Sequence, residues 1–144
     1  MNAKIEPLYD DVSMKKKTLF QRIVIKLIGD IYLSRSLKKQ LAMRPETWGL
    51  GLWPDEETKR VAIICAEHLS ANYGCPDDKL IPEDSMGLIA AVDPLCDFDD
   101  YAVVDVESEF ECELDPALFR QGTFRGLVDA VVKARNTEHT LKIL

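Results

Sequence analysis

Residues 97–114 read DFDDYAVVDVESEFECEL, and this stretch decides the fold that the sequence predicts. It reads as an acidic helix over about 98–110, followed by a short Phe-x-x-x-Leu exit from Phe110 to Leu114. Soon after this exit, Thr123 introduces a second helical pattern over about 123–135. The central stretch of the chain therefore predicts two helices joined by a short connection.

A further helix is predicted upstream, beginning at Pro54. Acidic residues fill its first turn, where they meet the positive end of the helix dipole, and apolar residues then recur over about five turns. Gly74 and Pro76 end it. Residues 76–95 lack strong periodicity and predict a long loop with a short helical turn at 87–92. No alternating pattern of the β type stands out, so the predicted fold class is all-α.

Residues 15–44 predict an extra N-terminal helical segment that is basic and amphipathic. Its first part carries an apolar face made of Leu19, Ile23, Leu27 and Ile31. A second piece runs from about Ser34 to Arg44 and ends before Pro45. The linker that follows contains Trp48 and Trp53, which we expect to hold it on a core.

The charge is divided unevenly between two predicted domains. Residues 1–50, the basic extension with its tryptophan linker, carry ten Lys/Arg and five Asp/Glu, whereas residues 51–144, the helical domain, carry eight and twenty. The net charges are therefore +5 and −12. We expect the segment 15–44 to dock on the acidic domain. An anionic membrane surface is a less favoured alternative, and nucleic acid is not expected because the acidic domain would repel it.

The cysteines and the N-terminus predict a reduced, cytoplasmic protein. Cysteines at positions 65, 75, 96 and 112 form no C-x-x-C pair, and the two histidines lack metal-ligand spacing. No cleavable signal pattern precedes the first apolar run. We therefore expect no metal site, and we expect the cysteines to act as small hydrophobic residues.

The order of these elements resembles that of acyl carrier proteins over residues 54–135. The first helix contains ETKRVAIICAEHL at 57–69, and the loop reads PDDKLIPEDS at 76–85; the acidic helix and the Thr-started helix follow. The resemblance implies a helical bundle whose acidic helix docks on basic enzyme surfaces. In a working carrier that helix begins Asp-Ser-Leu, and the serine carries 4′-phosphopantetheine.

The attachment serine is missing from the corresponding place, which reads CDFDD at 96–100. This start resembles a branch of small bacterial acyl-carrier-like proteins with an Asp-x-Asp-Asp sequence, and no cofactor is expected. The alternative attachment site is Ser85, because Asp84-Ser85-Met86 resembles Asp-Ser-Leu. It lies 25 residues before Phe110, farther than the family spacing, so a serine that caps a short helix is the favoured interpretation.

The carboxylates of the acidic helix are the candidate partner-binding residues. They are Asp97, Asp99, Asp100, Asp105, Glu107 and Glu109. A solvated helix face is the competing interpretation; a cation or catalytic site is disfavoured because no glycine-turned calcium loop is present. His68 is expected to be a half-buried packing residue, and Cys96 is not expected to be reactive because acidic neighbours raise a thiol pKa.

The predicted function is that of a non-catalytic, acyl-carrier-like protein that binds a basic protein surface, for example on a biosynthetic or regulatory enzyme. Two alternatives stay open at the sequence level. One is a genuine carrier with 4′-phosphopantetheine on Ser85. The other is an acidic inhibitor or mimic that acts on an enzyme with a basic surface.

Overall fold

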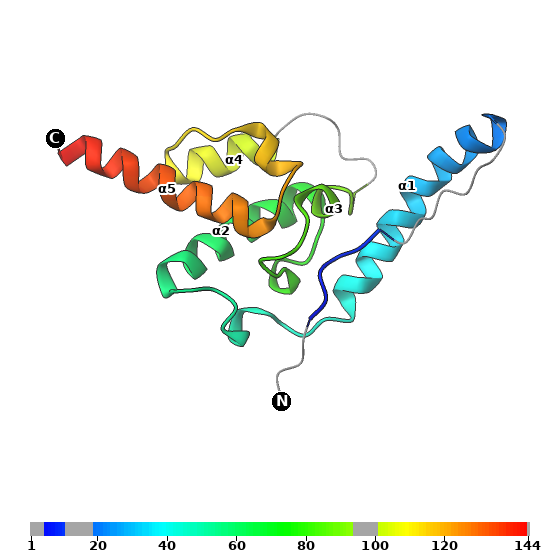
Figure 1. Ribbon diagram of the computed structural model, residues 1–144, viewed down its shortest axis with the longest axis horizontal. Coiled ribbons are helices and arrows are strands. Elements are labelled where there is room, and N and C mark those ends of the chain that lie inside the picture. Colours follow the sequence, from blue (N-terminus) through cyan, green and yellow to red (C-terminus); the bar gives the residue numbers. More distant parts are fainter. Residues whose placement is uncertain (1–4, 11–18, 94–100, 144) are drawn as a thin grey trace.

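The computed structural model describes residues 5–10, 19–93 and 101–143 (Figure 1). Its elements, in order, are α1 (Leu19–Ala42), η1 (Trp48–Leu50), α2 (Glu56–Tyr73), η2 (Asp77–Lys79), α3 (Met86–Ala90), α4 (Tyr101–Phe110), η3 (Pro116–Phe119) and α5 (Phe124–Ile143), where η denotes a 3₁₀ helix. Within these ranges there is no β-strand, and the one antiparallel bridge joins Ser85 to Thr123. The all-α prediction is confirmed.

Helix α2 lies at the centre of the bundle, in contact with α3, α4 and α5. The backbone N–H of Thr58 donates to the Asp55 carboxylate at 2.7 Å, which caps the first turn and lowers the Asp55 pKa. Gly74 ends the helix in the left-handed conformation, at φ 77°, with its N–H donating to the Ser70 carbonyl. The predicted start and stop of this helix are confirmed.

The hydrophobic core joins residues from both ends of the chain. Its largest fully buried side chains include Phe119, Phe124, Leu37, Leu41 and Leu69. Trp53 is buried, and its ring meets that of Phe124 edge-on with the centroids 5.5 Å apart. Trp48 is partly buried against the same core, so the linker is held down as predicted. The division into domains at residue 50 stays a prediction.

Helix α1 is one continuous helix of 24 residues, and the prediction of two separate pieces is wrong. Ser34 was expected at the start of the second piece. Its hydroxyl instead donates to the Val92 carbonyl while its own backbone continues the helix. No proline interrupts the chain between residues 19 and 42, so nothing forces a break there.

The C-terminal part of α1 contacts the bundle. Leu37 and Leu41 are fully buried, whereas Ile31 and Tyr32 are 50% and 59% exposed. The N-terminal half extends away from the other helices (Figure 1). Among the described residues, Ile31 therefore lacks the full cover that was expected, and the side chains of the other three residues predicted on that face lie outside the described part. The helix contacts the loop before α3, through Arg44 at its end, and the residues after α3, through Ser34.

The remaining connections follow the predicted local signals. The short helical turn expected at 87–92 is α3, which begins one residue earlier because Ser85 caps it. Asp115 caps η3 in the short connection between α4 and α5, and the Thr123 hydroxyl accepts from the Gly126 N–H at the start of α5. Helix α5 is longer than predicted. Among the described helices, none combines the length and the hydropathy that a membrane span requires.

Candidate functional site

The acidic helix expected over about 98–110 is α4, which the structure begins at Tyr101. Of the six predicted partner-binding residues, Asp97, Asp99 and Asp100 lie outside the described residues. The other three, Asp105, Glu107 and Glu109, lie on α4 and differ in their surroundings.

Asp105 and Glu107 are tied to the protein itself. The side-chain amide of Asn72 on α2 donates to the Asp105 carboxylate at 2.9 Å. The backbone N–H of Leu114 donates to the Glu107 carboxylate at 2.8 Å, which fixes the chain as it leaves the helix. Both carboxylates are only partly exposed, so each stabilises the fold and leaves only part of its side chain for contact with another molecule.

Glu109 is the most available of the three described carboxylates. Its side chain is 49% exposed, and its carboxylate lies 3.7 Å from Nε2 of His68, whose side chain is 28% exposed. At this distance the two groups form at most a weak ion pair, and only when His68 is protonated. His68 is half-buried between α2 and α4, as its position in the sequence predicted.

The outward stripe of α4 is partly apolar, a feature that sequence reasoning missed. Tyr101 is 65% exposed and Val104 is 56% exposed, one helical turn apart, and Ser108 and Glu111 continue the stripe at exposed positions. An aromatic ring and a branched aliphatic side chain exposed side by side are typical of the centre of a protein interface.

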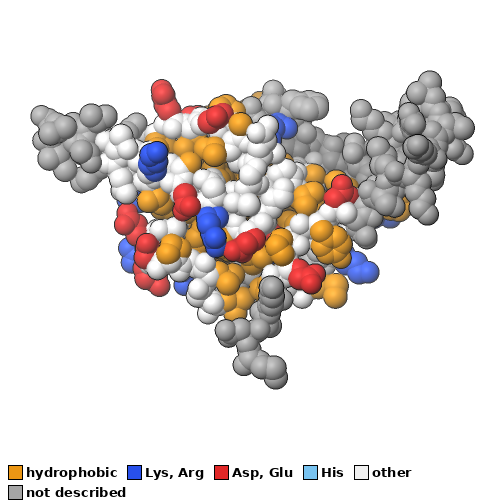
Figure 2. All heavy atoms as spheres, in the orientation of Figure 1, with side chains coloured by type: hydrophobic (Ala, Val, Ile, Leu, Met, Phe, Trp, Pro, Cys, Tyr) orange, Lys and Arg blue, Asp and Glu red, His pale blue; other side chains and the backbone are white. Residues whose placement is uncertain are grey.

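Acidic residues surround this stripe without a basic neighbour in sequence. Residues 101–119 contain six Asp or Glu and no Lys or Arg. Figure 2 shows acidic, basic and hydrophobic side chains interspersed over the face that it presents. The stretch therefore combines an apolar centre with a negative rim.

The end of α4 is held in an unusual backbone conformation. Glu111 has a positive φ of 51°, and the N–H of Cys112 donates to the Glu107 carbonyl at 3.1 Å, closing a Schellman-type turn. Glycine usually occupies this position, because a Cβ strains the left-handed backbone. An open hollow of about 630 Å³ lies beside the turn, lined by Glu107, Ser108 and residues 111–114.

Ser85, the alternative attachment residue, is the N-cap of α3. Its hydroxyl accepts from the Leu88 N–H at 3.4 Å, and the side chain is half-buried. The Met86 N–H donates to the Gly122 carbonyl at 2.9 Å, and a Cβ on Gly87 would lie 3.1 Å from the Arg120 carbonyl. The start of α3 is therefore packed against residues 120–123. The predicted capping role is confirmed.

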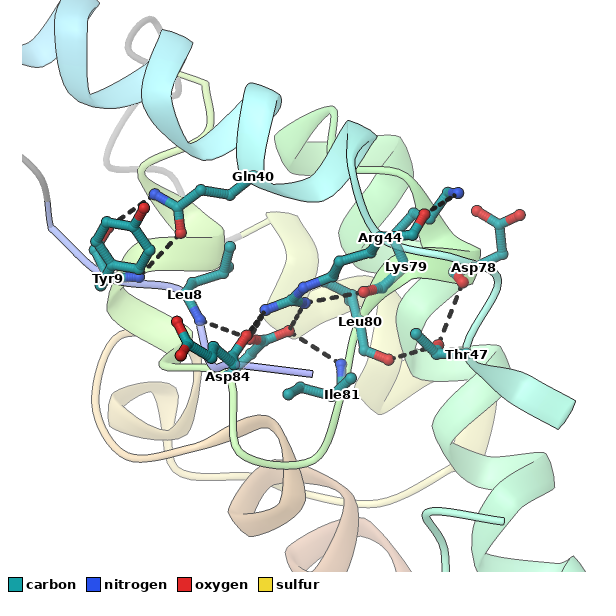
Figure 3. Close-up of polar contacts among 11 residues, drawn as sticks. Leu8, Tyr9, Gln40, Arg44, Thr47, Asp78, Lys79, Leu80, Ile81 and Asp84 are labelled. Carbon is teal, nitrogen blue, oxygen red and sulfur yellow. Dashed lines mark hydrogen bonds and ion pairs between the residues drawn. The ribbon is translucent and has the colours of Figure 1, made fainter. Parts of the chain in front are cut away.

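Asp84, the residue before Ser85, is fully buried and belongs to a polar cluster that the sequence did not reveal (Figure 3). The Arg44 guanidinium donates to both of its oxygens, at 2.7 and 2.8 Å. The backbone N–H groups of Leu8 and Ile81 donate to the same carboxylate. Arg44, 40 positions earlier, thus ties the end of α1 to the loop before α3.

The described cysteines are packing residues. Cys65, Cys75 and Cys112 are buried, whereas Cys96 lies outside the described residues. Burial raises the pKa of Cys65 and of Cys75 to about 12, so both stay protonated at neutral pH. Within the described part of the chain, no group of three His, Cys, Asp or Glu side chains is placed to hold a metal ion.

No protein-family model, curated protein or solved structure matches this chain. The likeness to acyl carrier proteins therefore stays a prediction from the order of the sequence motifs.

Proposed function

We propose that this is a non-catalytic, acyl-carrier-like helical protein that acts by protein–protein contact, with α4 as its docking helix. The observation that carries the proposal is the exposed pair Tyr101 and Val104 within a stretch of six carboxylates and no basic residue. The apolar pair offers area to bury, and the carboxylates orient a basic partner. A basic patch on an enzyme is the partner of matching charge.

The order of the helices supports the same proposal. A long first helix, a loop with a short helix, an acidic helix and a closing helix follow one another as in the carrier family that the sequence resembles. In such a bundle the acidic helix is a docking element. Helix α4 packs on α2 and contacts η3, which would hold it rigid, so its outward stripe is presented without a large ordering cost.

The structure changes which residues should be tested. Glu107 fixes Leu114 and Asp105 fixes Asn72, so reversing their charge would disturb the helix as well as a surface. Glu109 and Glu113 are exposed and are better choices. The matched control is Asp129→Lys, because Asp129 is an exposed carboxylate on α5.

The test is a quantitative capture experiment with the full chain as bait. Tyr101→Ala and the double variant Glu109→Lys/Glu113→Lys should each lose the captured partner, while Asp129→Lys should retain it. Capture should also weaken as salt rises, because the screening length is about 10 Å at 0.1 M ionic strength. If both α4 variants capture the same proteins as the wild type, with helicity unchanged, the docking surface is not α4.

The carrier alternative is tested separately, at Ser85. Incubation with coenzyme A and a broad-specificity phosphopantetheinyl transferase should add no mass, because the head of α3 is packed against residues 120–123. Transfer of the phosphopantetheine group requires a serine hydroxyl at an accessible helix N-terminus, where backbone N–H groups favour the phosphate. A gain of one pantetheine arm that disappears in Ser85→Ala would establish the carrier function instead.

A further inference from the structure

The short segment 5–10 runs beside the end of α1 and the loop before α3 (Figures 1 and 3). The surface that it covers, which includes Gln40, Arg44 and Asp84, is called the groove below. The side-chain amide of Gln40 binds it at both main-chain groups of one residue: Oε1 accepts from the Tyr9 N–H at 3.2 Å, and Nε2 donates to the Tyr9 carbonyl at 3.0 Å. One glutamine thus recognises the backbone of Tyr9 and ignores its ring, since Tyr9 is 52% exposed.

The buried ion pair binds the segment in the same manner. Asp84 accepts from the Leu8 N–H at 3.0 Å, and Arg44 donates to the Glu6 carbonyl at 2.8 Å. These contacts again go to main-chain atoms. The side chain of Leu8 is the deeply buried anchor, at 6% exposure, in the same hydrophobic cluster as Leu37 and Leu41.

Arg44 and Asp84 are also held by contacts outside the segment. Arg44 also donates to the Lys79 carbonyl at 2.9 Å, and Asp84 also accepts from the Ile81 N–H at 2.9 Å. Their mutual ion pair adds two further bonds. The groups that bind the segment would therefore keep their positions if it left, which is the preorganisation that a binding site requires.

The segment also leaves part of the groove unfilled. A hollow of about 290 Å³ remains beside Tyr9, lined on the other side by Gln40, Met43 and Pro45. Met43 is 78% exposed at its edge. A ligand with a larger side chain next to the anchor would gain contacts here that the chain's own residues do not make.

We propose that this groove is a binding site for extended peptides and that residues 5–10 are its built-in ligand. The partner it fits is an extended segment of another protein with leucine at the place of Leu8, held through its main chain by Gln40, Arg44 and Asp84. Main-chain bonds supply affinity and the apolar pocket supplies specificity, as in other sites for extended peptides. The site is separate from α4 and does not depend on the function proposed for it.

The test uses the full chain with its own anchor weakened. A fluorescent, end-capped peptide of residues 5–10 is titrated into the Leu8→Ala protein and into the wild type, and binding is followed by anisotropy. The variant should bind at least about tenfold more tightly, because in the wild type the resident segment competes for the groove. A peptide carrying alanine in place of leucine should bind at least about tenfold more weakly.

Matched changes in the groove give the second arm. In the Leu8→Ala background, Gln40→Ala should weaken peptide binding about tenfold, whereas Lys38→Ala, exposed on the same helix, should leave it unchanged. If Leu8→Ala unfolds the protein, added peptide should restore helicity, since a ligand stabilises the state that binds it. No binding, no rescue, or equal binding to all variants and both peptides would overturn the proposal.

Discussion

Asp84 and the carboxylates of α4 place the same chemical group in two opposite surroundings. Asp84 has no exposed surface and accepts hydrogen bonds from Arg44 and from two backbone N–H groups. Glu109 is half exposed, and the basic group that the structure places beside it is His68, at 3.7 Å. The buried group has used its bonding capacity within the fold, whereas the exposed group has capacity left that the docking proposal assigns to a partner.

We therefore expect the buried carboxylate to contribute to the stability of the fold and the exposed carboxylates to contribute little to it. Removing one partner of a buried ion pair leaves the other charge unpaired in a medium of low dielectric constant, which is strongly unfavourable. An exposed charge is hydrated and screened, and its removal changes the fold little. Acidic residues in this chain should therefore fall into two classes in mutagenesis.

The largest effect is expected when the buried pair is broken. Asp84→Ala should lower the free energy of unfolding by about 3–5 kcal/mol, because Arg44 would stay buried without its partner. Urea unfolding followed by circular dichroism measures this. A loss below about 1 kcal/mol would show that the buried Arg44–Asp84 pair contributes little to the stability of the fold.

Glu83 provides the neighbouring control. It forms an ion pair with Arg125 at the same distance, 2.7 Å, but both side chains are about half exposed. Glu83→Ala should lower the free energy of unfolding by only about 0–1 kcal/mol. Two adjacent acidic residues with equal ion-pair distances should thus differ severalfold, because Asp84 is buried and also accepts from two backbone N–H groups.

The parts of the fold that the sequence predicts are those with local signals. The helix ends depend on backbone groups within four residues of the capping residue, as at Asp55 before α2, Gly74 after it and Thr123 before α5. They can therefore be predicted from the sequence alone. The Arg44–Asp84 pair has no such signal. Forty positions separate the two residues, and Asp84 is hidden in a tripeptide that resembles a carrier attachment motif.

The candidate site was only half predictable for a similar reason. The acidic character of α4 is visible in the sequence, but Tyr101 and Val104 share the i, i+3 spacing that equally marks a core-facing stripe. Only the packing of α4 on α2, with Ala102 and Val106 buried, shows that the other stripe faces outward.

Alkaline pH should destabilise the surroundings of α4 and those of Asp84, through one buried thiol in each. Cys65 is buried near Cys112 at the end of α4, and Cys75 is buried near Asp77 and Asp84; burial is the main cause that raises each pKa from 9.0 to about 12. The unfolded chain loses these protons above pH 9 and the folded chain does not. Stability is therefore complete below pH 9 and falls as pH rises toward 12.

Each thiol contributes a slope of up to about 1.4 kcal/mol per pH unit in that window. Urea unfolding between pH 8 and 11 should show a shallower decline in Cys65→Ala and in Cys75→Ala than in the wild type. Tyrosine and lysine titrate in the same range and are common to all three proteins. Equal declines in the three would mean that the thiols are not protected by burial.

A smaller effect, of opposite sign, is expected at the end of α4. Glu111→Gly should raise the free energy of unfolding by about 1 kcal/mol, because glycine adopts the left-handed backbone without the strain of a Cβ. Glu113→Gly, two residues on and exposed, removes the same charge and should not stabilise. A destabilised Glu111→Gly protein would indicate that the Glu111 side chain itself supports the turn.

The smallest effect should come from the exposed carboxylate that the docking proposal uses. Glu109→Gln should change the free energy of unfolding by less than about 0.5 kcal/mol, because the side chain is 49% exposed and its carboxylate lies 3.7 Å from Nε2 of His68. Glu107→Ala, on the same helix, should lower it by about 1 kcal/mol through the lost bond to the Leu114 N–H. Thermal and urea unfolding of the two variants, run together at pH 7, make the comparison. If Glu109→Gln proves the more damaging change, this carboxylate belongs to the fold and the docking surface has to be sought among the other exposed residues of α4.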